Sequence, residues 1–244
     1  MTKKTFITLE KTLSTNTWML EMPELERVDT VVCAREQTGG KGMGTNVWES
    51  APGMNLTFSM GADLSFMKAV NQFQLSQAVP LGLVDVLDPL LPVKAFVKWP
   101  NDIIVDGRKL CGILINSTVH GMDMGVSVIG IGLNVNQMRF QDWPTCPVSL
   151  QMVLGREITL EPLLQQLVTA VDRRIQQLRS PEGVEMIKKD YLDRLYRYHT
   201  WANYETKEGL VKLYIDGIDA FGRLMTLDES GKPRIFDVKE LRFV

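Results

Sequence analysis

Apolar positions change their spacing along the chain, which separates a strand-rich first half from a helical stretch and a strand-rich end. Short β-branched runs bounded by glycine, proline or asparagine predict strands. Such runs lie at residues 30–34, 54–60, 95–99, 110–117 and 126–131. The pairs Asp106-Gly107 and His120-Gly121 suit tight turns between consecutive strands. A β-sheet is therefore predicted at the centre of the protein.

Helical spacing of apolar residues occurs in three stretches. Residues 65–91 carry an apolar stripe that Pro80 interrupts, which predicts one long helix or two shorter ones covering the sheet. Residues 160–178 place leucine, valine and isoleucine side chains on one face, the strongest helical pattern in the chain. A further helix is predicted for residues 181–198.

The pattern changes near residue 198. Beyond it, short alternating runs are split by Asp216-Gly217 and Ser230-Gly231, which predicts antiparallel strands joined by tight turns. We therefore predict two domains, residues 1–198 and residues 199–244, and expect the second to be a small β-barrel.

Composition narrows the class of protein without identifying it. The 45% hydrophobic and 23% charged residues are typical of soluble globular proteins. A formal net charge of -2 gives no broad positive surface for nucleic acid, and no segment has the apolar length of a signal peptide or membrane span. We expect a cytoplasmic protein that binds neither DNA nor membranes. Its three widely spaced cysteines are expected to be reduced, buried thiols, namely Cys33, Cys111 and Cys146.

A glycine-rich loop at residues 37–48 reads Gln-Thr-Gly-Gly-Lys-Gly-Met-Gly-Thr-Asn-Val-Trp. Glycines let backbone N–H groups approach an anion closely, and a lysine adds positive charge, so the loop suits a phosphate or carboxylate. On composition alone a flexible surface loop is an equally good interpretation. The loop has neither the P-loop pattern nor the dinucleotide-binding pattern.

Other polar motifs follow strands, and each also has a plain structural interpretation. Residues 98–102, Lys-Trp-Pro-Asn-Asp, end a strand; Asn101 could bond a nucleotide and Asp102 could hold Mg²⁺, although an ordinary turn explains them better in isolation. Lys109 lies at the mouth of a strand, where it is either a solvated charge or a cation that stabilises a reacting group.

Two further motifs are equally ambiguous. Residues 130–136, Gly-Ile-Gly-Leu-Asn-Val-Asn, would allow a ligand close to the backbone, and a strand-to-loop junction explains them nearly as well. Residues 14–16, Ser-Thr-Asn, suit a helix cap first and a polar ligand second.

In this order and spacing, the motifs together resemble those of the biotin protein ligases. Residues 217–219 and 222–224 are similar to the family's small SH3-like domain, so the resemblance covers essentially the whole chain. It implies an α+β fold: a mixed β-sheet covered by helices, as in class II synthetase-like enzymes and biotin ligases, followed by an SH3-like barrel. Family members that are also repressors have an N-terminal winged helix before these motifs. Here the motifs begin almost at residue one, so we expect the short form.

The resemblance implies an ATP-dependent ligase. Such an enzyme activates biotin to biotinyl-5'-AMP, releases pyrophosphate, and transfers biotin to a specific lysine of a biotin carboxyl carrier protein that belongs to a biotin-dependent carboxylase. Mg²⁺ would accompany ATP, and a homodimer is compatible with the family.

The resemblance also assigns site residues. It implies Lys109 and Lys41 as catalytic groups and Asp102 as the metal ligand. The residues implied for biotin are Ser14, Thr15, Asn16, Gln37, Lys109 and Gly112. The residues implied for the nucleotide are Gly40, Lys41, Gly42, Met43, Trp48, Asn101 and Asn134.

The glycine loop departs from the family pattern, which usually reads G-R-G-(R/Q)-x-G. Residues 40–45 are Gly-Lys-Gly-Met-Gly-Thr. Lys41 keeps a charge without the two-pronged geometry of arginine, and Met43 donates no hydrogen bond. We expect weaker retention of biotinyl-AMP.

Two other functions remain open from the sequence. A lipoate or octanoate ligase or transferase shares the fold, although polar residues at 14–16 and Gln37 favour a ligand with a ring to hydrogen-bond. A non-catalytic biotin-binding module is the second alternative, because the glycine loop is altered.

Overall fold

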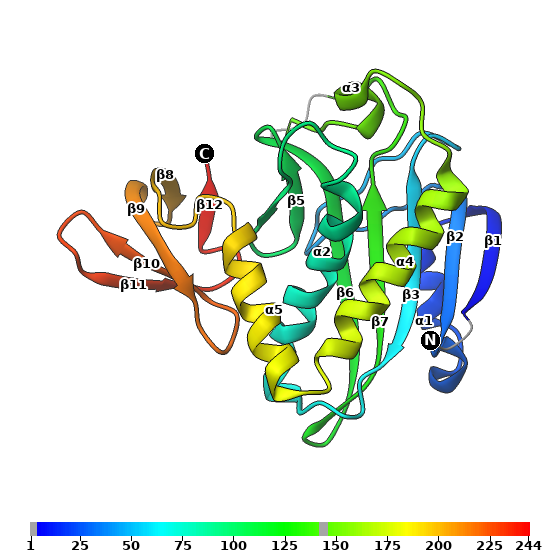
Figure 1. Ribbon diagram of the computed structural model, residues 1–244, viewed down its shortest axis with the longest axis horizontal. Helices are drawn as coiled ribbons and strands as arrows, with labels where there is room; N and C mark the ends of the chain where they lie inside the picture. The colour runs from blue at the N-terminus through cyan, green and yellow to red at the C-terminus, as the bar shows by residue number, and fades with distance from the viewer. Residues whose placement is uncertain (1–3, 142–145) are drawn as a thin grey trace.

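Seven strands form the central sheet of the computed structural model, which describes residues 4–141 and 146–244 (Figure 1). The strand order is β1-β2-β3-β7-β6-β5-β4; β1 and β2 pair in parallel and the other neighbours pair antiparallel. The strands are β1 (Thr5–Thr12), β2 (Thr30–Gln37), β3 (Leu56–Asp63), β4 (Phe96–Lys98), β5 (Asp102–Val105), β6 (Arg108–His120) and β7 (Asp123–Leu133).

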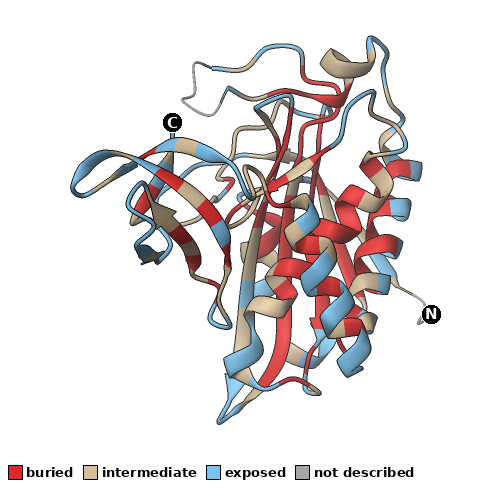
Figure 2. Cartoon of the chain, turned by 60° about the vertical axis from the view of Figure 1, so that its left-hand side comes forward, coloured by how far each residue is buried: buried red, intermediate tan, exposed pale blue. Residues whose placement is uncertain are grey.

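Three helices cover one face of this sheet, and Figure 2 shows buried residues concentrated where the two layers meet. They are α2 (Phe73–Leu87), α4 (Leu160–Gln177) and α5 (Pro181–Arg194). Leu83, Leu167 and Ile187 join the sheet residues in one apolar core. Alternation along a strand divides the faces: Ile129 and Ile131 of β7 face this core, whereas the glycines between and after them face the other side.

The opposite face carries the short helix α1 (Thr15–Leu20). Its Met19 packs with Val32 and Val128 in a smaller apolar cluster. The remaining helical segments are η1 (Glu24–Arg27), η2 (Ala69–Asn71) and α3 (Leu150–Leu154). This second face, called here the site face, is therefore only partly covered by helix.

Five antiparallel strands form a second sheet at the C-terminal end, in the order β11-β10-β9-β8-β12. They are β8 (Trp201–Thr206), β9 (Gly209–Ile218), β10 (Leu224–Asp228), β11 (Pro233–Phe236) and β12 (Leu241–Phe243). The predicted α+β class, with a mixed sheet, covering helices and a separate small sheet, is thus confirmed. The domain boundary at 198 and the SH3-like character remain predictions.

The two sheets meet at the turn after β4. The indole Nε1 of Trp99 donates a buried hydrogen bond to the carbonyl of Gly222, at 2.8 Å. The Lys98 ammonium lies 5.1 Å from the centre of the Phe243 ring. These contacts fix the C-terminal sheet, called here the C-terminal domain, beside the end of the central sheet.

Several local predictions need correction. The helix predicted for residues 65–91 begins at Phe73 and continues through Pro80, since the residues on both sides of the proline are buried in the core. The helix predicted for 181–198 ends at Arg194.

The three cysteines are free thiols, but only Cys111 is buried, whereas Cys33 is partly exposed and Cys146 exposed. Among the described residues, no helix is long and apolar enough to cross a membrane.

Candidate functional site

The glycine loop between β2 and β3 folds into a small hairpin over the site face of the sheet. Lys41 and Val47 form an antiparallel bridge, and the Gly42 N–H donates to the Asn46 carbonyl at 2.8 Å. The Trp48 N–H closes the base of the hairpin by donating to the Gly40 carbonyl at 2.9 Å. The loop is therefore hydrogen-bonded to itself over residues 40–48.

Two facing glycines make room for the Trp48 indole. Gly112 on β6 is the register partner of Gly132 on β7. A Cβ at Gly132 would lie 2.3 Å from an indole carbon, and one at Gly112 would lie 3.0 Å from another. The indole thus rests directly on the backbone of the two strands. Its Nε1 is buried without a hydrogen-bond partner in the described structure, which leaves a donor for a ligand.

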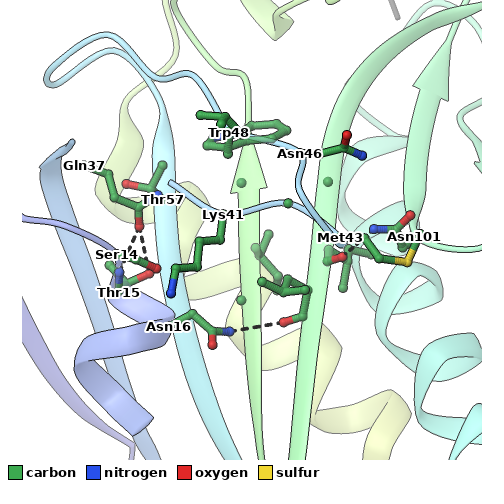
Figure 3. A pocket seen from close by; sticks show the side chains of 18 of the residues that line it. Ser14, Thr15, Asn16, Gln37, Lys41, Met43, Asn46, Trp48, Thr57 and Asn101 are labelled. Atoms are coloured by element: carbon green, nitrogen blue, oxygen red, sulfur yellow. Dashed lines mark hydrogen bonds between the residues drawn. The ribbon is translucent and has the colours of Figure 1, made fainter. Parts of the chain in front are cut away.

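All six residues predicted to bind biotin line one cavity of about 140 Å³ beneath this loop (Figure 3). They are Ser14, Thr15, Asn16, Gln37, Lys109 and Gly112. They come from α1 and its cap, from the end of β2, and from β6. The sheet thus brings together segments that are about a hundred residues apart.

Hydrogen bonds fix the polar wall of this cavity. Ser14 caps α1 by accepting from the Thr17 N–H at 3.4 Å, as the sequence predicts. The Thr15 N–H donates to the Gln37 side-chain oxygen at 2.9 Å. Asn16 donates to the Leu114 carbonyl at 3.2 Å, and its own side-chain oxygen has no partner among the described residues. The wall therefore offers hydrogen-bonding groups whose positions are already set.

Lys41 extends from the loop toward Thr15 and Asn16 in Figure 3. Met43 and Trp48 also line this first cavity. The expectation that Lys41 closes over phosphates remains a prediction, because here its ammonium is directed to the polar wall.

Lys109 lines both this cavity and the neighbouring one, and it lies beside a carboxylate. Its Nζ is 2.7 Å from the Asp102 side chain on the neighbouring strand β5, and 5.7 Å from the centre of the Trp48 ring. Burial lowers the pKa of the nearby Lys98 ammonium; the Asp102 carboxylate opposes this shift, and the charges of Lys109 and Arg197 add to it. Positive charge thus exceeds negative charge here, which favours an anionic ligand.

A second cavity of about 470 Å³ adjoins the first and shares Trp48 and Lys109 with it. Asn134 lines it and is 2% exposed; its side-chain nitrogen donates to the Val148 carbonyl at 3.1 Å, while its buried side-chain oxygen has no partner in the described structure. Arg242 of β12 lines the same cavity, where it also pairs with Glu205. Arg242 was not predicted from the sequence, because no local motif surrounds it.

At the boundary between the two cavities, a metal ion would find one carboxylate ligand, Asp102. Asp102 lies beside Asn101, which also lines the first cavity and whose side-chain nitrogen donates to the Ile113 carbonyl at 2.8 Å. The described residues contain no group of three or more His, Cys, Asp or Glu side chains that could hold a metal. These residues fit a magnesium ion shared with substrate phosphates, not a site built from protein alone.

Comparison with known proteins gives a consistent result. The model of the biotin/lipoate A/B protein ligase family matches residues 8–134, more than half of the chain. The bifunctional ligase/repressor BirA of Bacillus spizizenii is 27% identical over 85% of this chain, which spans 64% of that protein's length. The biotin–acetyl-CoA-carboxylase ligase of Paracoccus denitrificans is 28% identical, with 92% of this chain and 95% of that protein covered.

Solved structures share the fold. The biotin protein ligase from Aquifex aeolicus, determined in complex with biotin and ATP, superposes with a TM-score of 0.80 at 20% identity. The match covers 98% of this chain and 97% of that one. Both the central sheet and the C-terminal domain therefore have counterparts in that structure.

Proposed function

Because the chain belongs to the biotin/lipoate A/B protein ligase family, we propose that it is a biotin protein ligase. It activates biotin with ATP to give biotinyl-5'-AMP and pyrophosphate, and then transfers biotin to a lysine of a biotin carboxyl carrier protein. We place this activity in the cytoplasm, where ATP is available and thiols stay reduced.

One observation carries the proposal: two adjoining cavities meet at Lys109 and Trp48. The first has a polar wall around a narrow space. The second is larger and is lined by Asn134, whose side-chain oxygen has no partner among the described residues. A small acid and a nucleotide bound side by side would place carboxylate and phosphate at the shared boundary.

The first cavity suits the ureido ring of biotin, which carries one acceptor and two donors. The side-chain oxygen of Asn16 accepts a donor, and the hydroxyl groups of Ser14 and Thr15 can serve either role. Since these groups are positioned by their other hydrogen bonds, little ordering is needed when biotin binds.

Lys109 would assist the first chemical step. The biotin carboxylate attacks the α-phosphorus of ATP, the new acyl–phosphate bond forms, and pyrophosphate leaves. A fixed ammonium at the junction neutralises negative charge as the two anions approach. Magnesium, when bound, supplies charge to the phosphates, and Asp102 and Asn101 would hold it.

In the second step, the neutral amine of the carrier lysine attacks the acyl carbon of biotinyl-AMP. An amide forms as the nitrogen loses a proton to solvent, and AMP leaves with the electron pair of the broken acyl–phosphate bond. The Trp48 indole and the glycine loop would exclude water from the anhydride, since they cover the boundary between the two cavities.

Lipoate or octanoate is the competing substrate class. A fatty-acyl chain would give no partner to the side-chain oxygen of Asn16 or to the side-chain nitrogen of Gln37, which costs binding energy. Thermal-shift titration should therefore show stabilisation by biotin and little by lipoate. The opposite ranking would favour the alternative.

The decisive experiment measures pyrophosphate release on mixing the protein with biotin and ATP. Lys109→Ala should slow release on the order of a hundredfold, because a preorganised charge is lost at a developing anion. Lys68→Ala is the matched control: its Nζ is also paired with an aspartate, Asp123, at 2.6 Å, but this pair is exposed. Equal rates for both variants would contradict the assignment of Lys109.

A further inference from the structure

The tip of the glycine loop touches the C-terminal domain. Gly44 has φ +69°, and a Cβ added there would lie 2.7 Å from Nζ of Lys239 and 3.1 Å from its Cε. The end of the lysine side chain thus rests on the loop tip. Both the positive φ and the close approach of Lys239 favour glycine at position 44.

Lys239 is presented by a tight turn between β11 and β12. Its own φ is +74°, which is uncommon for a residue with a side chain. The turn is closed by the Glu240 N–H, which donates to the Asp237 carbonyl at 3.1 Å, and by the Glu240 carboxylate, which accepts from the Asp237 N–H at 2.9 Å. The turn therefore holds Lys239 in a defined direction.

The Lys239 ammonium has no carboxylate partner in the described structure. Glu240, the nearest acid in sequence, is engaged with the turn and lies 4.0 Å from Lys207. The contact lies beside the second cavity, which is lined by Thr45 and Asn46 of the loop and by Arg242 of β12. An unpaired cation is thus placed at the edge of the proposed nucleotide site.

The glycine loop itself directs no cationic side chain toward the second cavity. Lys41 is directed to the polar wall of the first cavity, and Met43 carries no charge (Figure 3). The loop tip would therefore close over a phosphate without a positive charge of its own.

We propose that Lys239 supplies this charge from the C-terminal domain. It is a positioning residue: its ammonium holds the tip of the glycine loop closed when the phosphate of biotinyl-AMP lies in the second cavity, and so prolongs retention of the intermediate. The inference rests on the proposed ligase function and adds a contribution of the C-terminal domain to it.

The first test follows dissociation of preformed biotinyl-AMP from the full chain. Lys239→Ala should accelerate release about fivefold, the upper scale of an exposed charge interaction, and Lys239→Arg should restore slow release. Lys232→Ala, which removes an exposed lysine from the β10–β11 turn of the same domain, is the control and should not change the rate. Unchanged release in Lys239→Ala would overturn the proposal.

A double-mutant cycle separates this role from a general structural one. Met43→Arg gives the loop its own cation and should slow release by about tenfold, since a charged hydrogen bond is gained. In the Met43→Arg background, Lys239→Ala should then change release by less than about twofold. If Lys239→Ala has the same effect in both backgrounds, the lysine does not compensate for Met43.

The same measurements distinguish failure of the inference from failure of the function. If the wild-type protein releases no pyrophosphate with biotin and ATP, the ligase function is wrong and the inference fails with it. If the wild type forms and holds biotinyl-AMP but Lys239→Ala retains it equally well, only the inference is wrong.

Discussion

The two faces of the central sheet share the same strands but differ in what covers them. On one face, α2, α4 and α5 bury the aliphatic side chains of the sheet in a continuous core. On the other, glycines alternate with those side chains, and over them lies a loop whose Trp48 indole N–H has no partner in the described part of the chain. The side chains of the first face pack against the helices. The second face has space and polar groups that a ligand can contact.

Residues that stabilise the fold and residues that shape the binding site therefore alternate within single strands. Residues 129, 131 and 133 of β7 contribute to the core, whereas Gly130 and Gly132 shape the cavity wall. A glycine-to-alanine substitution should therefore lower the stability of the fold on the covered face and weaken ligand binding on the site face.

Gly82→Ala should give the largest effect and act on stability. A Cβ at Gly82 in α2 would lie 2.5 Å from the Cα of Val171 in α4, and a helix backbone cannot easily move away. We expect a loss of about 1–3 kcal/mol in the free energy of unfolding, measured by urea denaturation. The dissociation constant for biotin should stay the same. Weakened biotin binding in a folded variant would show that the two faces are not separable.

Gly132→Ala should act on binding. Its Cβ would meet the Trp48 indole, which belongs to a loop and can shift, so the free energy of unfolding should change by less than about 1 kcal/mol. Displacement of the indole alters both cavities, and biotin affinity by calorimetry should fall about tenfold. Unchanged affinity would mean that the indole does not define the cavity.

Asp85→Asn should give the smallest effect, a loss of stability whose size depends on pH. Burial disfavours ionisation of this carboxyl, but hydrogen bonds and charges from Arg174 and Arg173 outweigh it and hold the pKa below its usual value. Because the folded pKa is depressed, the carboxylate stabilises the fold fully above the ordinary pKa of about 3.9 and loses this contribution as pH falls through the folded pKa.

The stability difference between wild type and Asp85→Asn should accordingly be largest near neutral pH and shrink below about pH 4. Melting temperatures between pH 7 and pH 3 would measure it. Asp123→Asn, which breaks the exposed pair with Lys68, is the control and should have little effect at either end of the range. If the stability difference between the two proteins grew on acidification, the pKa of Asp85 would not be lowered in the folded state.

The covered face was the more predictable of the two from the sequence. One-sided burial produces regular apolar spacing, so the pattern at residues 160–178 predicted α4 to within one residue. Edge and short strands gave weaker signals: β1 is exposed along much of its length, and β5 contains only 4 residues behind a proline-containing turn. Neither strand was predicted.

The site was predicted as a set of residues but not as a geometry. Motif resemblance assigned six residues to biotin, and the structure brings all six to one cavity. Lys41 extends toward Thr15 and Asn16, which lie elsewhere in the sequence (Figure 3). Arg242 and Lys239 come from the opposite end of the chain, so no pattern local to the glycine loop could indicate them.

The pairing of β3 with β7 has a consequence for how the protein acquires activity. The cavity wall needs this non-local pairing, the adjacent β6, and a loop tip that meets the C-terminal domain. Contacts of such high sequence separation form slowly, because chain entropy is lost before they stabilise anything. Ligand capture should therefore develop late during refolding, after the helices, and added biotin would bind only chains that have completed the native topology.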